Sequence, residues 1–182
     1  MPQFQLNTPP AKAHPFYSLG TLARGYVEAM FFTNCDSGNA EREDHANELG
    51  VERLTRASVA AIKRDCDAFE SHIMPDGCTV RQWLDRVPDY EEEQAGRDFW
   101  LTRQGHGCGF WDREALDVDL YAPQEGDSQA EVYVEGWRVA DDSAAFREGA
   151  APVGNIRDGL ADAAKHFGES YPEIYRGWIH YR

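Results

Sequence analysis

The chain has 182 residues with 32 acidic and 18 basic side chains, which gives a formal net charge of −14. Its length fits one domain, and 42% hydrophobic residues exclude a disordered polymer. The acidic excess disfavours direct nucleic-acid binding and favours a basic protein partner, a cationic ligand or metal ions, although the charge can also serve solubility alone. The sequence contains neither an apolar run of bilayer length nor a signal peptide, so we expect a cytoplasmic protein without membrane contact.

Helical periodicity dominates the pattern along the chain. Residues 1–15 are rich in proline and predict an extended arm. Beyond this arm, apolar side chains recur at spacings of three and four residues, which is typical of helices with one buried face. The predicted helices cover residues 19–33, 56–73, 79–87 and 156–167.

The stretch 98–113 concentrates aromatic residues around three closely spaced glycines. Two aromatic runs that flank a Gly-His-Gly turn predict a β-hairpin with strands at 98–104 and 108–113. Because both faces of this hairpin carry bulky side chains, we expect Trp100 and Trp111 to lie at the centre of the core.

Two further segments are rich in β-branched and aromatic residues, at 131–139 and 174–181. Together with the hairpin they predict an antiparallel sheet packed against several helices. We therefore expect an α+β fold that forms a single domain over residues 1–182.

The stretch 98–113 also resembles a signature in a family of small, functionally uncharacterised proteins of tailed bacteriophages and prophages. Those proteins typically read D-F-W-L-T-R-N-G-H-G-A-G-F-W-D-R, and here Gln104 replaces the asparagine and Cys108 the alanine. The resemblance extends to residues 25–32 and 65–69.

It resumes at residues 160–169. In the family pattern this last helix follows the signature closely, so residues 114–155 look like an insertion. The resemblance implies a phage accessory protein in the cytoplasm of a bacterial host, and it supplies no mechanism.

His106 is the leading candidate for chemistry. An imidazole between two glycines is open to a ligand and can act as an acid, a base or a ligand near neutral pH. Asp98, Asp112 and Arg103 would lie beside it at the base of the hairpin. The alternative is that the Asp and Arg side chains pair across the strands to fix register, while His106 shapes the turn.

Exposed acidic blocks are the candidate binding surface. Their residues are Glu91, Glu92, Glu93, Asp117 and Asp119. They would contact a basic protein partner. If the carboxylates imitate the phosphates of DNA, that partner is a DNA-binding host protein, and the alternative is that they simply solvate loops. The four cysteines form no C-x-x-C pair and the histidines show no metal-ligand spacing, so we expect reduced thiols, no metal and no cofactor.

Two functions follow from these patterns. The leading expectation is an acidic phage or prophage accessory protein that binds a host or phage protein, for instance to counter a host defence. The alternative is a small enzyme or ligand-binding domain that uses a pocket around His106. No nucleophile motif accompanies His106, so binding is favoured over catalysis.

Overall fold

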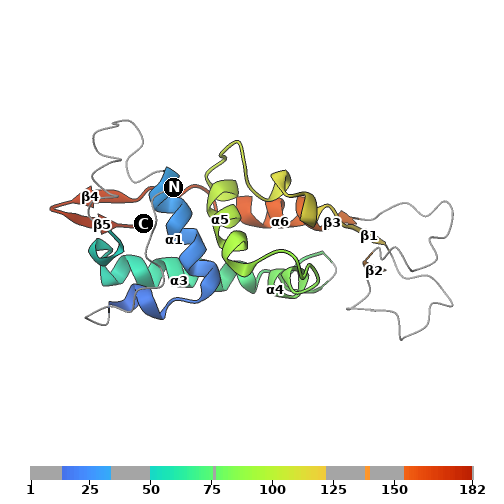
Figure 1. Ribbon diagram of the computed structural model, residues 1–182, viewed down its shortest axis with the longest axis horizontal. Coiled ribbons are helices and arrows are strands. Elements are labelled where there is room, and N and C mark those ends of the chain that lie inside the picture. The colour runs from blue at the N-terminus through green and yellow to red at the C-terminus, as the bar shows by residue number, and fades with distance from the viewer. Residues whose placement is uncertain (1–13, 34–49, 76, 122–137, 140–153, 182) are drawn as a thin grey trace.

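The computed structural model describes residues 14–33, 50–75, 77–121, 138–139 and 154–181, and within these ranges the fold is α+β (Figure 1). Helices fill the middle of the molecule, and the two small antiparallel sheets lie at its opposite ends. The α-helices are α1 (Thr21–Thr33), α3 (Arg56–Glu70), α4 (Val80–Leu84), α5 (Glu92–Arg103) and α6 (Ile156–Lys165). Short 3-10 turns are η1 (Pro15–Ser18), η2 (Val51–Arg53), η3 (Phe110–Asp112) and η4 (Glu114–Leu116).

The four helices predicted from periodicity are confirmed, with boundaries shifted by a few residues. Their starts follow from side-chain caps. Thr55 accepts a hydrogen bond from the Ser58 amide at the start of α3, and Thr79 forms a capping box with Gln82 at the start of α4. Asn155 caps α6 by accepting a hydrogen bond from the backbone amide of Arg157 through its side-chain oxygen. Among the described residues, no helix is both long and apolar enough to cross a bilayer.

Helices α1 and α5 make the closest helix contact in the described fold. A Cβ atom added to Gly25 on α1 would overlap the carbonyl oxygen of Glu93, and one added to Gly96 on α5 would overlap that of Leu22. The two backbones therefore touch where the helices cross, which only glycine permits. This crossing brings Tyr26 of α1 against the aromatic side chains of α5.

The core is built on stacked aromatic rings. Phe69 of α3 and Phe99 of α5 stack with centroids 4.0 Å apart, and both side chains are fully buried. Trp100 is also fully buried, as expected, and its indole N–H donates to the Thr33 hydroxyl at 2.6 Å. Trp111 packs against the edge of the core and is only partly buried.

The predicted central hairpin at 98–113 is wrong. Its first strand is the C-terminal half of α5, and its second is a loop followed by η3. The helix ends in a Schellman motif at Gly105, which has a φ of +66°. The backbone amide of Gly105 donates to the Thr102 carbonyl, and the backbone amide of His106 donates to the Leu101 carbonyl. The Phe110 amide then donates to the Thr102 hydroxyl at 3.0 Å, which folds the loop back onto the helix.

The physical reason is the helix crossing. Gly96 lies inside α5. The contact with α1 requires a residue without a Cβ atom at this position. Ala95, Phe99 and Thr102 then share one buried face at helical spacing. The glycine at 105 terminates this helix instead of forming a hairpin turn.

The strands also differ from the expected sheet. The predicted strand 174–181 is a hairpin of β4 (Glu173–Tyr175) and β5 (Trp178–His180), joined through Arg176 and Gly177, both with positive φ. A second sheet has the order β2–β1–β3. Its strands are β1 (Asp119–Tyr121), β2 (Arg138–Val139) and β3 (Gly154–Asn155).

Three sequence expectations fall wholly or partly outside the described residues. They are the arm at 1–15, the strand at 131–139, of which only the last two residues are described, and the insertion at 114–155. The described parts of this last segment carry β1, β2 and β3, and its status as an insertion stays a prediction.

Replacing Gly25 or Gly96 with alanine is expected to lower the free energy of unfolding by about 3 kcal/mol or more, because the new Cβ meets backbone that cannot move aside. Gly20→Ala is the matched control, since nothing lies within 4 Å of its added Cβ. We expect that control to change stability by less than about 1 kcal/mol in urea unfolding followed by circular dichroism. Equal losses at all three positions would contradict a specific helix crossing.

Candidate functional site

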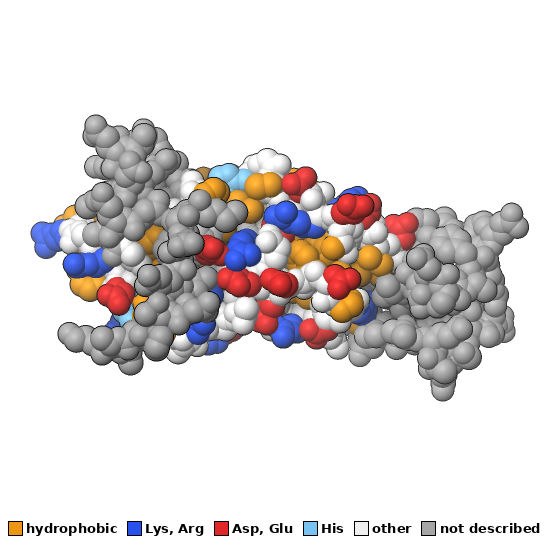
Figure 2. Space-filling model, in the orientation of Figure 1, with side chains coloured by type: hydrophobic (Ala, Val, Ile, Leu, Met, Phe, Trp, Pro, Cys, Tyr) orange, Lys and Arg blue, Asp and Glu red, His pale blue; other side chains and the backbone are white. Residues whose placement is uncertain are grey.

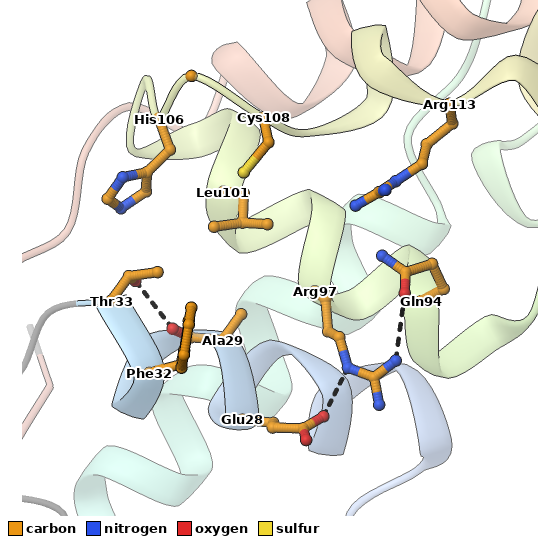
Figure 3. A pocket seen from close by; sticks show the side chains of 11 residues that line it. Glu28, Ala29, Phe32, Thr33, Gln94, Arg97, Leu101, His106, Cys108 and Arg113 are labelled. Atoms are coloured by element: carbon orange, nitrogen blue, oxygen red, sulfur yellow. Dashed lines mark hydrogen bonds and ion pairs between the residues drawn. The ribbon is translucent and has the colours of Figure 1, made fainter. Parts of the chain in front are cut away.

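A cavity of about 460 Å³ lies between α1, α5 and the loop that follows α5 (Figure 3). We call it the His106 pocket. Its apolar wall comes from Ala29 and Phe32 of α1, Leu101 of α5 and Cys108 of the loop. The remaining lining residues are Glu28, Thr33, Gln94, Arg97, His106, Gly107 and Arg113.

The Schellman end of α5 positions His106 over this pocket. The backbone turn at Gly105 directs the following residues back across the helix end, so that His106 and Cys108 both face the cavity (Figure 3). The Nε2 atom of His106 is shielded from solvent, and it has no hydrogen-bond partner among the described residues. Buried polar atoms are nearly always hydrogen-bonded, so this nitrogen is an exception that calls for an explanation.

The opposite side of the pocket is cationic but internally paired. Arg97 donates through Nε to Glu28 at 2.5 Å and through Nη1 to Gln94 at 3.2 Å, and its Nη2 lies 3.1 Å from Glu93. Arg113 lies beside it and points into the pocket (Figure 3).

Asp98 lies beneath Arg113 and is fully buried. Arg113 donates to both of its carboxylate oxygens, at 2.6 and 2.5 Å, in a bidentate ion pair. The Tyr90 hydroxyl donates at 2.6 Å and Gln94 at 3.1 Å. Burial raises the pKa of Tyr90, and the adjacent Asp98 charge raises it further. The carboxylate of Asp98 is therefore held in the core and supports the pocket through Arg113.

Arg103 and Asp112 are not part of the pocket. Arg103 lies in a separate buried network, where it donates to Asp65 and Tyr26 at 2.8 Å and to the hydroxyl of Tyr181. Asp112 is exposed on η3. The structure thus places His106 at the pocket wall and Asp98 behind Arg113 of the same pocket, and it separates the other two candidates from this region.

The acidic candidates lie in two regions, and most of them already have intramolecular partners. Glu92 pairs with Arg81 at 3.0 Å, and Glu93 with Arg97. Asp117 pairs with Arg157 at 3.1 Å, and Asp119 accepts a hydrogen bond from the side-chain amide of Asn155 at 2.9 Å. Glu91 is exposed at the N-cap of α5. Figure 2 shows acidic and basic side chains interspersed on the described part of this face, without a continuous block of one sign.

The described residues contain no group of three His, Cys, Asp or Glu side chains that could hold a metal ion. Three of the four cysteines are described, and all three are free thiols. Cys66 and Cys78 are buried, whereas Cys108 is half-buried at the pocket wall. Burial raises the pKa of the Cys66 thiol, which keeps that residue unreactive.

Sequence reasoning named Arg113 as a cation near the candidate site, but it missed three other polar residues of the pocket, Glu28, Gln94 and Arg97. A helical signal was present, because Gln94, Arg97, Asp98 and Leu101 follow the spacing of one helix face. The predicted strand at 98–104 obscured this helical spacing, because it assigned Asp98 and Leu101 to a different element from Gln94 and Arg97.

Comparison with protein-family models, with curated proteins and with solved structures found no match to this chain. The geometry of the pocket and of the exposed surface is therefore the basis for a function.

The network around Arg103 predicts alkaline destabilisation. Burial raises the pKa of Tyr181 to about 12, and it raises the pKa of Tyr26 well above its usual value. An unfolded tyrosine titrates near about 10, so the folded state holds these protons more tightly. The resulting stability is complete below pH about 10 and is lost as the pH rises toward about 12. Urea unfolding at a series of pH values should show this loss.

Tyr181→Phe is the matched variant for this experiment. It removes one of the two titrating hydroxyls, so its stability should fall less steeply above pH about 10 than that of the parent protein. Parallel curves for the two proteins would contradict a role for Tyr181 in the alkaline loss.

Proposed function

We propose that this protein binds a small organic molecule in the His106 pocket. The observation that carries the proposal is the buried Nε2 atom of His106, which lacks a partner at the wall of a cavity. A ligand with a polar group at this position would supply the missing hydrogen bond. The volume of about 460 Å³ falls within the range of small-molecule sites, roughly 300–1,000 Å³.

The surroundings of His106 favour binding over catalysis. A catalytic histidine is normally oriented by a third group and lies within hydrogen-bond reach of a nucleophile or of the proton it transfers. Among the described residues, no hydrogen bond joins the His106 ring to Cys108 or to a carboxylate. Asp98 is occupied by Arg113, Tyr90 and Gln94, so it is not free to orient the imidazole.

Capture of fragments by Cys108 tests this proposal. A disulfide fragment exchanges with the Cys108 thiol and releases its leaving thiol, and non-covalent contacts in the pocket then raise the retention of the bound fragment. We expect a phenylethyl fragment to resist reduction at Cys108 about fivefold or more better than a hydroxyethyl fragment, because its ring contacts the apolar wall. Peptide mass mapping across a series of reductant concentrations measures this ratio.

Ala29→Phe is the control, because the larger side chain fills the pocket from α1. A folded Ala29→Phe protein should retain both fragments to the same extent. Equal retention of the two fragments by the parent protein would overturn the proposal.

A second proposed function is association with a host or phage protein, in the setting of a phage or prophage accessory protein in the bacterial cytoplasm. The observation that favours it is the outer face of the β4–β5 hairpin. Tyr175 and Trp178 pair across the strands and remain 59% and 43% exposed. Arg176 lies over the first ring and Arg53 over the second. Tyrosine, tryptophan and arginine are the residues enriched at the energetic centres of protein interfaces.

This surface replaces the acidic residues as the expected contact, since Glu92, Glu93, Asp117 and Asp119 already have intramolecular partners. Trp178→Ala should reduce capture of a partner from host lysate by about tenfold or more, whereas Glu91→Lys should leave capture nearly unchanged. Loss of capture on Glu91→Lys alone would restore the acidic surface as the contact.

A further inference from the structure

We propose that the ligand of the His106 pocket is an uncharged molecule with an apolar body and a hydrogen-bond acceptor oxygen directed at Arg113. This inference rests on the proposed small-molecule function and adds the chemical class of the ligand. It follows from the hydrogen bonds that the lining residues leave unmade and from the charges that surround the cavity.

Most polar groups of the lining already have partners. All three guanidinium nitrogens of Arg97 face Glu28, Gln94 or Glu93. The Gln94 side chain donates to Asp98 and accepts from Arg97. The Thr33 hydroxyl donates to the Ala29 carbonyl and accepts from Trp100. These groups therefore have little capacity left to recognise a ligand.

Two nitrogens remain. The Nε and Nη2 atoms of Arg113 donate to Asp98, but its Nη1 donates to no residue that the structure describes. The second nitrogen is Nε2 of His106. Arginine Nη1 only donates, so the ligand must present an acceptor there, whereas imidazole pairs with either a donor or an acceptor.

The charge around the pocket argues against an ionised ligand. Arg113 is neutralised by Asp98, and Arg97 is shared by Glu28 and Glu93. Two cations thus face three carboxylates, so no excess positive charge remains to stabilise an anion. The two arginines already hold these three carboxylates, so a cationic ligand would have to share a carboxylate with Arg97 or Arg113. Removing an unpaired charge from water is costly, and an uncharged ligand avoids that cost.

The placement of these groups sets the shape of the ligand. In Figure 3, His106 and Arg113 approach the cavity from opposite sides, with Leu101 and Cys108 between them and Phe32 facing from α1. A ligand that satisfies both nitrogens therefore has an apolar middle and polar ends. An aromatic or branched body with a carboxamide at one end and an alcohol or a second amide at the other has this arrangement.

A matched set of thiol fragments tests this class through exchange at Cys108. All fragments share a phenylethyl body, and the para group is carboxamide, carboxylate, aminomethyl or methyl. We expect the carboxamide fragment to be retained about fivefold or more over each of the others, because only its oxygen is both uncharged and able to accept from Arg113. A hydroxyethyl fragment gives the baseline.

Two variants identify the groups involved. Arg113→Lys keeps a cation beside Asp98 and removes the guanidinium, so the preference for carboxamide over methyl should fall to about twofold or less. Arg157→Lys makes the same change at an arginine that pairs with Asp117 outside the pocket lining, so it should keep that preference. The melting temperature of each variant confirms that the pocket remains folded.

The outcomes separate the two proposals. Retention of all four phenylethyl fragments equally above the baseline would overturn the uncharged class and leave small-molecule binding intact. Preference for the carboxylate or the aminomethyl fragment would also overturn it. Retention of every phenylethyl fragment at the hydroxyethyl baseline would instead overturn the proposed function itself.

Discussion

The fold depends on one buried guanidinium, that of Arg103 at the C-terminal end of α5. Its side chain is 8% exposed, and it donates to Asp65 on α3, to the hydroxyls of Tyr26 on α1 and Tyr181 near the C-terminus, and to the Phe167 carbonyl beyond α6. Four segments that are distant in sequence therefore meet at one charged group. A buried charge is tolerated only while its partners are in place, so the packing of each segment depends on the others. The same contacts anchor the C-terminal end of α5, just before the loop that carries His106.

The pocket follows from two backbone features of the same helix. Near its start, the close approach of Gly25 to the Glu93 carbonyl and of Gly96 to the Leu22 carbonyl holds α5 directly against α1. At its end, the turn at Gly105 carries the chain back over the helix. The cavity lies along this pair of helices and beneath the returning loop. Of its polar lining residues, Arg97 belongs to α5, whereas His106 and Arg113 belong to the segment that follows α5. The ligand chemistry proposed above is therefore set by features that also determine the fold.

Much of the helical part of this fold was predictable, because burial on one face leaves a periodic trace in the sequence. Residues 56–73 carry such a trace, and α3 occupies most of that range. The stretch 98–113 was not predictable in the same way, because aromatic residues before a glycine fit both a hairpin and a helix that ends at that glycine. The contact that decides between them, at Gly96, is tertiary. His106 was identified from its glycine neighbours, whereas the pair of Glu28 and Arg97 spans 69 residues and leaves no local signal.

Arg113 belongs to the pocket and to the core at once, and this shared role bears on how the protein can diverge. A substitution of Arg113 leaves the buried carboxylate of Asp98 without its ion pair, so the cationic side of the pocket is closed to most sequence change. Phe32, on the opposite wall, is 61% exposed, so its replacement costs the core little. If the pocket takes the proposed kind of ligand, related proteins with other ligands are thus expected to differ first at Phe32, where sequence change meets little constraint from folding.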